Sequence, residues 1–157
     1  MELYSVGRRN LIRFVKFVRR TYWTSRAKLK CKSYGEELRV NYKCHFTKNT
    51  VFGSHDNFNG MKIQGEGIVR FGNYFHSGED CRIITDIHNF DFGTEIPYDS
   101  TKIVKDVIIG DFVWIGTCVI ILGGVEIGEG AIIQAVLLFL IFRRTQLLEE
   151  LQQRYLR

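Results

Sequence analysis

The sequence lacks three features that would assign the chain to a common class. No apolar segment among its 157 residues approaches the roughly 18 residues that span a bilayer, so we expect no membrane-spanning helix. The N-terminus has no apolar core followed by a small-residue cleavage site, which argues against a secretory signal. The four cysteines include no Cys-x-x-Cys pair and predict reduced, mostly buried thiols in a cytosolic protein.

Acidic residues are absent from residues 8–32, although this stretch contains ten lysines and arginines. Residues 33–135 contain 8 basic and 14 acidic residues, a balance of −6. The net charge of +5 therefore comes from one local segment, and it does not imply a nucleic-acid-binding domain.

A period of six residues organises the stretch 107–135. Isoleucine recurs at 109, 115, 121, 127 and 133, and Val107, Val113, Val119, Val125 and Ala131 keep the same period two positions earlier. Residues two apart share one face of a strand, so each pair points the same way. A glycine follows three of the isoleucines and suits a tight corner, as do Asp111 and Glu129. Stacked short strands of this kind predict an all-β solenoid with a continuous aliphatic core.

The same period appears in weaker form earlier in the chain. Val40, Phe46, Phe52 and Phe58 are six apart, and so are Ile63, Val69, Phe75, Cys81 and Ile87. The step from Phe58 to Ile63 is five residues, which predicts a short coil or a register shift. With three strands per triangular coil, residues 38–135 form roughly five coils.

Residues 8–30 predict one basic, amphipathic helix, and residues 1–37 form this helix and its linker. Its apolar residues recur at helical spacing, at Leu11, Ile12, Val15, Val18 and Tyr22, with Phe14 and Phe17 beside them. Two interpretations stay open. The helix packs on the first coil and covers an open solenoid end, or it lies on an anionic membrane face.

Two segments interrupt the repeat. Residues 88–102 have no period, contain the only proline, and predict a surface loop inserted into the solenoid, where function often resides. Residues 136–157 contain no glycine and begin with seven apolar residues, which predicts a helical tail.

The repeat VIIGDFVWIGTCVIILGGVEIGEGAIIQA, preceded by IITDIHNFDFGTEIPYD, resembles the left-handed β-helix acyltransferases. The closest resemblance is to the maltose, galactoside, nodulation and surface-polysaccharide O-acetyltransferases. It covers residues 38–135 and stops at Ala135. The resemblance implies left-handed coils and a homotrimer. It also implies acetyl-CoA bound between subunits beside a loop histidine, and transfer of the acetyl group to a sugar or polysaccharide hydroxyl.

By this resemblance His88 is the catalytic histidine. A sugar hydroxyl is barely ionised at pH 7, and a neutral imidazole can take its proton during attack on the thioester. Asp86, Asp91 or Glu95 could orient the ring, with Asn89 also nearby, and the sequence does not distinguish among them.

The resemblance assigns a cofactor groove and an acceptor contact to further residues. Trp114, Gly116 and Thr117 match positions that line the groove, and the backbone N–H groups of Thr117 and Ala135 match cofactor contacts. Trp114 also fits a corner residue against a neighbouring subunit. Asn57 and Asn59 match an acceptor-binding position, although asparagine also fills corners in any β-helix.

No metal site is expected, because His45, His55, His76 and His88 lack the spacing of zinc-binding β-helices. Two other functions remain open. The chain could be a non-catalytic trimeric scaffold, or a glycan-binding protein docked on the cytoplasmic face of a membrane by its basic helix. The acceptor sugar is not specified by the sequence.

The sequence of residues 136–157 indicates that this tail is the product of a frameshift. The family expects Gly-Ser-Val-Val and Ile-Pro-Ala-Tyr after the alanine, and a one-base shift in plausible codons for residues 136–157 recovers both. On this interpretation the chain has lost its last coil and a basic residue near the CoA phosphates, which would impair activity. The alternative is a genuine C-terminal helix covering the last coil.

Overall fold

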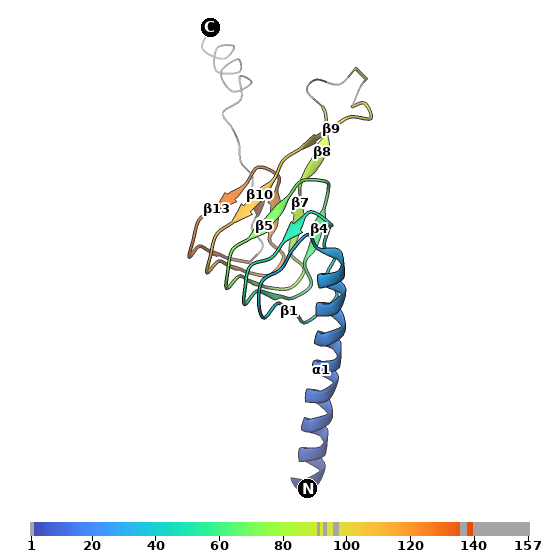
Figure 1. Cartoon of the computed structure of the whole chain (residues 1–157), viewed down its shortest axis with the longest axis vertical. Helices are drawn as coiled ribbons and strands as arrows, with labels where there is room; N and C mark the ends of the chain where they lie inside the picture. The colour runs from blue at the N-terminus through green and yellow to red at the C-terminus, as the bar shows by residue number, and fades with distance from the viewer. Residues whose placement is uncertain (1, 91, 93, 96–97, 136–137, 140–157) are drawn as a thin grey trace.

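The computed structural model describes residues 2–90, 92, 94–95, 98–135 and 138–139. A long helix, α1 (Glu2–Lys30), leads into a three-sided parallel β-helix from which a hairpin projects (Figure 1). Except in that hairpin, every paired strand runs parallel to its neighbours. The architecture is therefore the solenoid that the six-residue period predicts.

The strands form three faces, which the chain visits in turn. Face I contains β2 (Thr50–Val51), β5 (Val69–Phe71), β10 (Val107–Ile109) and β13 (Glu126–Ile127). Face II contains β1 (Arg39–Val40), β3 (Asn57–Phe58), β6 (His76–Ser77), β11 (Trp114–Ile115) and β14 (Ile132–Ile133). Face III contains β4 (Lys62–Gln64), β7 (Arg82–Ile84), β12 (Ile120–Leu122) and β15 (Leu138–Phe139). The five strands of face II match the five predicted coils.

The core lies inside the prism and consists of the predicted columns. Val107, Val113, Val119 and their isoleucine partners are at most 1% exposed. At the N-terminal end the aliphatic residues give way to packed aromatic rings, with centroids of Phe46 and Phe52 4.8 Å apart. The short step before Ile63 is accommodated at Gly60, whose φ is +83°.

One edge of the prism is built from residues in the left-handed backbone region. Between face I and face II, Glu37, His55, Tyr74, Phe112 and Gly130 have φ between +48° and +70°. The ring of Tyr74 stacks on His55 at 4.7 Å and on Phe112 at 5.1 Å. Stacking of successive corner rings supports a backbone conformation that is otherwise costly for residues with a Cβ.

Helix α1 covers the first coil, but not with the predicted face. Ala27 is 4% exposed, Trp23 packs on the core, and Thr24 Oγ1 accepts a hydrogen bond from the N–H of Val40 at 3.0 Å. The predicted stripe is instead exposed, at Leu11, Ile12, Val15, Val18 and Tyr22. Ala27 lies nine residues after Val18, about two and a half turns, so the two point to opposite sides of the helix. The N-terminal turns of α1 also extend past the prism (Figure 1).

Two boundaries differ from the sequence prediction. The insertion leaves the prism after Thr85, so Ile87, predicted as core, is 41% exposed in a hairpin strand. Leu138–Phe139 form a strand rather than part of a helix, because their backbone continues the parallel ladder on Ile120 and Ile121. The rest of the predicted helical tail, and the frameshift interpretation, lie outside the described residues.

Two sequence expectations concern the chain as a whole. In the part of the chain that the structure describes, no helix has the length and apolar content to cross a bilayer. All four cysteines are free: Cys81 is buried, Cys31 and Cys44 are half-buried, and Cys118 is exposed. The predicted burial of the thiols is therefore correct for Cys81 and wrong for Cys118, which lies at a prism corner with φ of +58°.

Candidate active site

The insertion is a braced hairpin rather than an unstructured loop. Strands β8 (Asp86–His88) and β9 (Lys102–Val104) pair antiparallel, with Asp86 opposite Val104 and His88 opposite Lys102. At its base Lys102 Nζ lies 2.8 Å from Asp86 Oδ2. The hydrogen bond to Asp86 raises the pKa of Lys102. Asp86, one of the acids proposed to orient His88, is thus paired with a cation.

His88 is exposed and stacks on an aromatic ring that the sequence analysis did not identify. The ring centroids of His88 and Tyr98 are 3.8 Å apart and the planes are inclined by 19°. Stacking restricts the imidazole while leaving its edge open to solvent. Tyr98 lies in a stretch without periodicity, so no sequence pattern indicates this contact.

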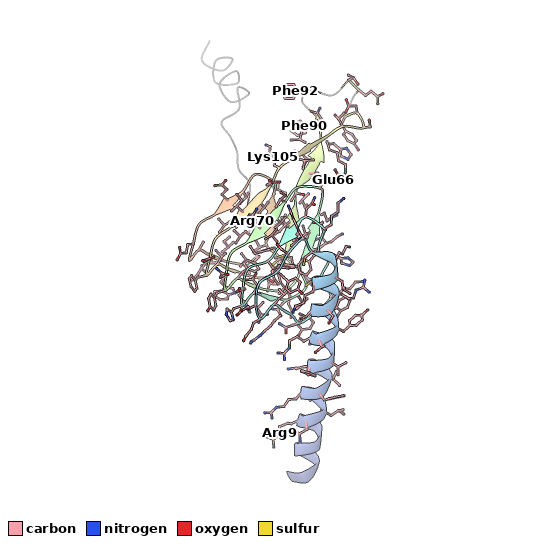
Figure 2. The ribbon with its side chains drawn as sticks, viewed as in Figure 1. Arg9, Glu66, Arg70, Phe90, Phe92 and Lys105 are labelled. Carbon is pink, nitrogen blue, oxygen red and sulfur yellow. The ribbon has the colours of Figure 1, made fainter. Side chains whose placement is uncertain are left out.

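The tip of the hairpin is held by a carboxylate and an amide. Asp99 accepts hydrogen bonds from the backbone N–H groups of Thr94 (2.9 Å) and Thr101 (2.8 Å), and from the hydroxyl of Thr101. These bonds, first of all the one from the Thr101 hydroxyl, lower the pKa of Asp99 to about 2. Asn89 Nδ2 donates to Thr101 Oγ1 at 3.0 Å, and its Oδ1 accepts from the N–H of Phe92. Phe92 is 84% exposed on the projecting tip (Figure 2).

Face II carries the predicted acceptor residues. Asn41 Nδ2 donates to Asn57 Oδ1 at 2.7 Å and to Asn59 Oδ1 at 2.9 Å. Asn59 Nδ2 in turn donates to the carbonyl of Ser77 at 2.7 Å. The amide of Asn59 therefore links three successive coils, and its contact with an acceptor stays a prediction.

The predicted cofactor residues follow one another on face II and at its edge with face III. Trp114 is 51% exposed on β11, in register with His76 and Ile132. A Cβ on Gly116 would lie 2.6 Å from the backbone nitrogen of Ala135, so glycine permits the close approach of these two coils. Thr117 is exposed, and among the described residues none accepts a hydrogen bond from its backbone N–H.

Within one chain the structure separates His88 from the other predicted site residues. The hairpin leaves from β7 on face III and returns to β10 on face I, so it stands on the edge between these faces. In a three-sided prism that edge is opposite face II. Asn57, Asn59, Trp114, Gly116, Thr117 and Ala135 lie on face II or at its edge with face III.

The described residues contain no group of three histidine, cysteine, aspartate or glutamate side chains arranged to hold a metal ion. The four histidines lie on different coils or faces: His45 bridges to Lys62, His55 and His76 belong to successive levels around face II, and His88 is on the hairpin.

Residues 106–135 match the family model described as bacterial transferase hexapeptide (six repeats). Over these residues the six-residue repeat is similar to the hexapeptide repeat of bacterial transferases. This match confirms the predicted resemblance over the repeat itself. A search of the curated proteins gives no match to the sequence.

Two solved structures show where this hexapeptide-repeat fold occurs. A hexapeptide-repeat acetyltransferase from Vibrio cholerae, complexed with acetyl-CoA, aligns with a TM-score of 0.58 at 22% identity, over 71% of this chain and 67% of that one. A mutant of AntD, an N-acyltransferase from Bacillus cereus, complexed with dTDP and CoA, aligns with a TM-score of 0.56 at 16% identity, over 84% of this chain and 94% of that one. The likeness supports the predicted left-handed β-helix.

Proposed function

We propose that the chain is an acyltransferase that takes an acetyl group from acetyl-CoA and transfers it to a sugar or glycan hydroxyl. The observation that carries the proposal is the position of His88 on a braced, projecting hairpin, with its imidazole edge open to solvent, in a chain with the transferase hexapeptide repeat. The acetyl-CoA complex of the Vibrio cholerae relative supports the choice of donor.

In the proposed reaction His88 acts as the general base. Its neutral imidazole takes the proton of the acceptor hydroxyl while the oxygen forms a bond to the thioester carbonyl carbon. The carbon–sulfur bond then breaks, and the imidazolium returns the proton to the departing CoA sulfur. The stack on Tyr98 restricts rotation of the His88 ring. Among the described residues, no carboxylate hydrogen-bonds to this ring, so the stack is the contact that orients it.

The donor would lie along the edge between face II and face III. The backbone N–H of Thr117, which donates to no described residue, is available there as a hydrogen-bond donor, and Gly116 allows the next coil to approach closely. Asn57 and Asn59 are proposed to contact the acceptor through the polar atoms left by their bonds to Asn41 and Ser77.

The proposed active form is a homotrimer. His88 and the groove residues stand on opposite sides of one prism, so one copy must place its hairpin edge against the groove of another. Face II offers an apolar surface for such a contact, because Trp114 and Ile132 are adjacent, in register and more than half exposed.

Mixed trimers test this arrangement. His88→Ala and Thr117→Trp, which would fill the groove, should each be inactive alone. Co-expressed, the two variants should recover part of the activity, because some interfaces join an intact His88 to an intact groove. Absence of recovery in purified mixed trimers would place the whole site within one chain, against the proposal.

A thioester assay tests the function itself. The purified chain is incubated with acetyl-CoA and a panel of sugars, amino sugars and glycans, and released CoA and acetylated product are measured. Acceptor-dependent release with an O-acetylated product supports the proposal. A stable trimer without turnover on any acceptor would favour the non-catalytic scaffold, and an N-acetylated product would move the acceptor to an amine.

A further inference from the structure

Helix α1 presents an apolar stripe that the fold does not use. The stripe consists of Leu11, Val15, Val18 and Tyr22, which recur every three or four residues. They are exposed by 48% to 62%. The side of the helix that contacts the prism, at Trp23 and Ala27, lies opposite this stripe. Burial of the helix against the first coil therefore leaves the stripe facing away from the prism.

The rest of α1 is strongly cationic, and its single acid, Glu2, stands at its first residue. Residues 8–32 contain ten lysines and arginines and no acid. The ion pairs among the described side chains are Arg39 with Glu37, His55 with Glu37 and Lys102 with Asp86, and none of them involves α1. The positive charge of the helix is therefore available to a partner.

The cations gather on the prism side of the helix and continue onto the first coil. A groove of about 360 Å³ between α1 and Asn59 is lined by Arg13, Lys16, Arg19 and Arg20. A second groove of about 490 Å³ is lined by Arg26, Lys30, Lys43 and His45. Burial lowers the pKa of His45, and its lysine and arginine neighbours lower it further, as expected for unneutralised positive charge.

We propose that α1 docks this protein on an anionic lipid bilayer. The stripe enters the boundary of the acyl chains, the lysines and arginines contact anionic headgroups, and the prism remains on the aqueous side. An apolar stripe opposite a face rich in lysine and arginine is the pattern of helices that lie in the membrane interface. Since no described helix can cross a bilayer, the contact is peripheral.

The charge pattern disfavours a second copy as the partner of the stripe. Two α1 helices packed stripe to stripe would bring eighteen cations together against one acid, Glu2, from each helix, and paired helices normally place opposite charges beside such a seam. A surface of anionic lipid supplies both the apolar layer and the missing negative charge.

Vesicle co-sedimentation of the full chain tests the proposal, and it needs no enzymatic activity. One set of vesicles contains phosphatidylcholine alone. The other contains phosphatidylglycerol and phosphatidylcholine in a ratio of about three to seven, and both are used in low salt. Because the cations of α1 are attracted to anionic headgroups, partitioning should be at least about tenfold stronger into the anionic vesicles and should weaken as salt is added.

Two matched double variants separate the stripe from the rest of the helix. Leu11→Gln with Val18→Gln removes apolar contact without changing charge, and should weaken partitioning by about tenfold or more. Asn10→Gln with Thr21→Gln introduces the same residue at exposed positions beside the stripe, and should leave partitioning within about twofold.

Three results would overturn the proposal. The first is equal binding to neutral and anionic vesicles, or binding to neither. The second is unchanged partitioning when the stripe is replaced. The third is a smaller oligomer of the stripe variant in the absence of lipid, which would show that a second copy of the chain covers the stripe.

Discussion

His88 and Tyr98 form a stacked pair across the inserted hairpin, with ring centroids 3.8 Å apart. The contact connects a strand of the hairpin with its projecting tip and leaves an imidazole edge open to solvent. Orientation of a catalytic histidine is commonly the task of a carboxylate. Asp86, one of the acids predicted to orient His88, is bound to Lys102, and the ring of Tyr98 stacks on the imidazole of this proposed base.

Replacement of Tyr98 should therefore impair turnover through the orientation of His88. An aromatic pair contributes about 0.5–1.5 kcal/mol, so Tyr98→Ala should lower kcat about 2- to 13-fold, and Tyr98→Phe, which retains the stack, should stay near the wild-type value. The measurement is steady-state acetyl transfer by the wild-type chain and the two variants. Equal losses in both variants would indicate a role of the hydroxyl rather than of the stack.

Asp99 should be required for the order of the hairpin tip. Its folded-state pKa of about 2 lies below the ordinary value, so its contribution is present above about pH 4 and is lost as the pH falls through 2. Asp99→Ala should accelerate hydrogen exchange at the amides of Thr94 and Thr101 at neutral pH. Exchange at β12 should not change, and unaltered exchange at the two threonines would contradict this account.

Sequence periodicity predicts the prism well because each coil repeats one local environment. Val113 and Ile115 are buried for the same reason as Val119 and Ile121, namely two inward positions per strand. The prediction fails at Ile87, where the chain leaves the repeat one strand earlier than the pattern indicates. A six-residue count contains no information on where a hairpin begins.

The site and the helix were less predictable because both depend on contacts between distant segments. The stripe on α1 is apolar, yet Trp23 and Ala27 are the residues that contact the first coil. Which side of the helix packs on the prism could not be predicted from the apolar pattern. His88 was identified from its surrounding motif. Its separation from Thr117 required the path of the insertion from face III to face I.

Asp56 should make the stability of the fold depend on pH. The two oxygens of its buried carboxyl group accept hydrogen bonds from the backbone N–H groups of Gly53 and Phe75, and burial outweighs these bonds and raises its pKa to about 7. The folded chain keeps this proton up to about pH 7, whereas the unfolded chain releases it near pH 4. The contribution of Asp56 to the free energy of unfolding is therefore fully present below pH 4 and is lost as the pH rises through 7.

Asp56→Asn tests this dependence. The amide oxygen of asparagine can accept from only one of the two backbone N–H groups, and the amide NH₂ would face the other N–H donor. The free energy of unfolding of the variant should therefore fall by about 1–3 kcal/mol. Urea unfolding at pH 5 and pH 8 should show a smaller pH effect in the variant than in the wild-type chain. An identical pH effect in both would assign it to other groups.

Gly116 should be intolerant of any side chain. A methyl group would lie 2.6 Å from the nitrogen and 2.9 Å from the Cα of Ala135, so Gly116→Ala should cost about 1–3 kcal/mol by overpacking. Gly128→Ala is the matched control, because its Cβ would meet no described atom within 4 Å. Thermal unfolding of both variants gives the comparison, and equal melting temperatures would contradict the close approach of the two coils.

The central claim is that His88 removes the acceptor proton, and the most direct test is acceptor-dependent CoA release by the trimeric chain before and after His88→Ala. General-base catalysis contributes about 10²–10⁴ in rate, so kcat should fall by this factor. His45→Ala, a change on the first coil away from the hairpin, should leave kcat unchanged. An active chain whose kcat is the same with and without the His88 imidazole would contradict the account.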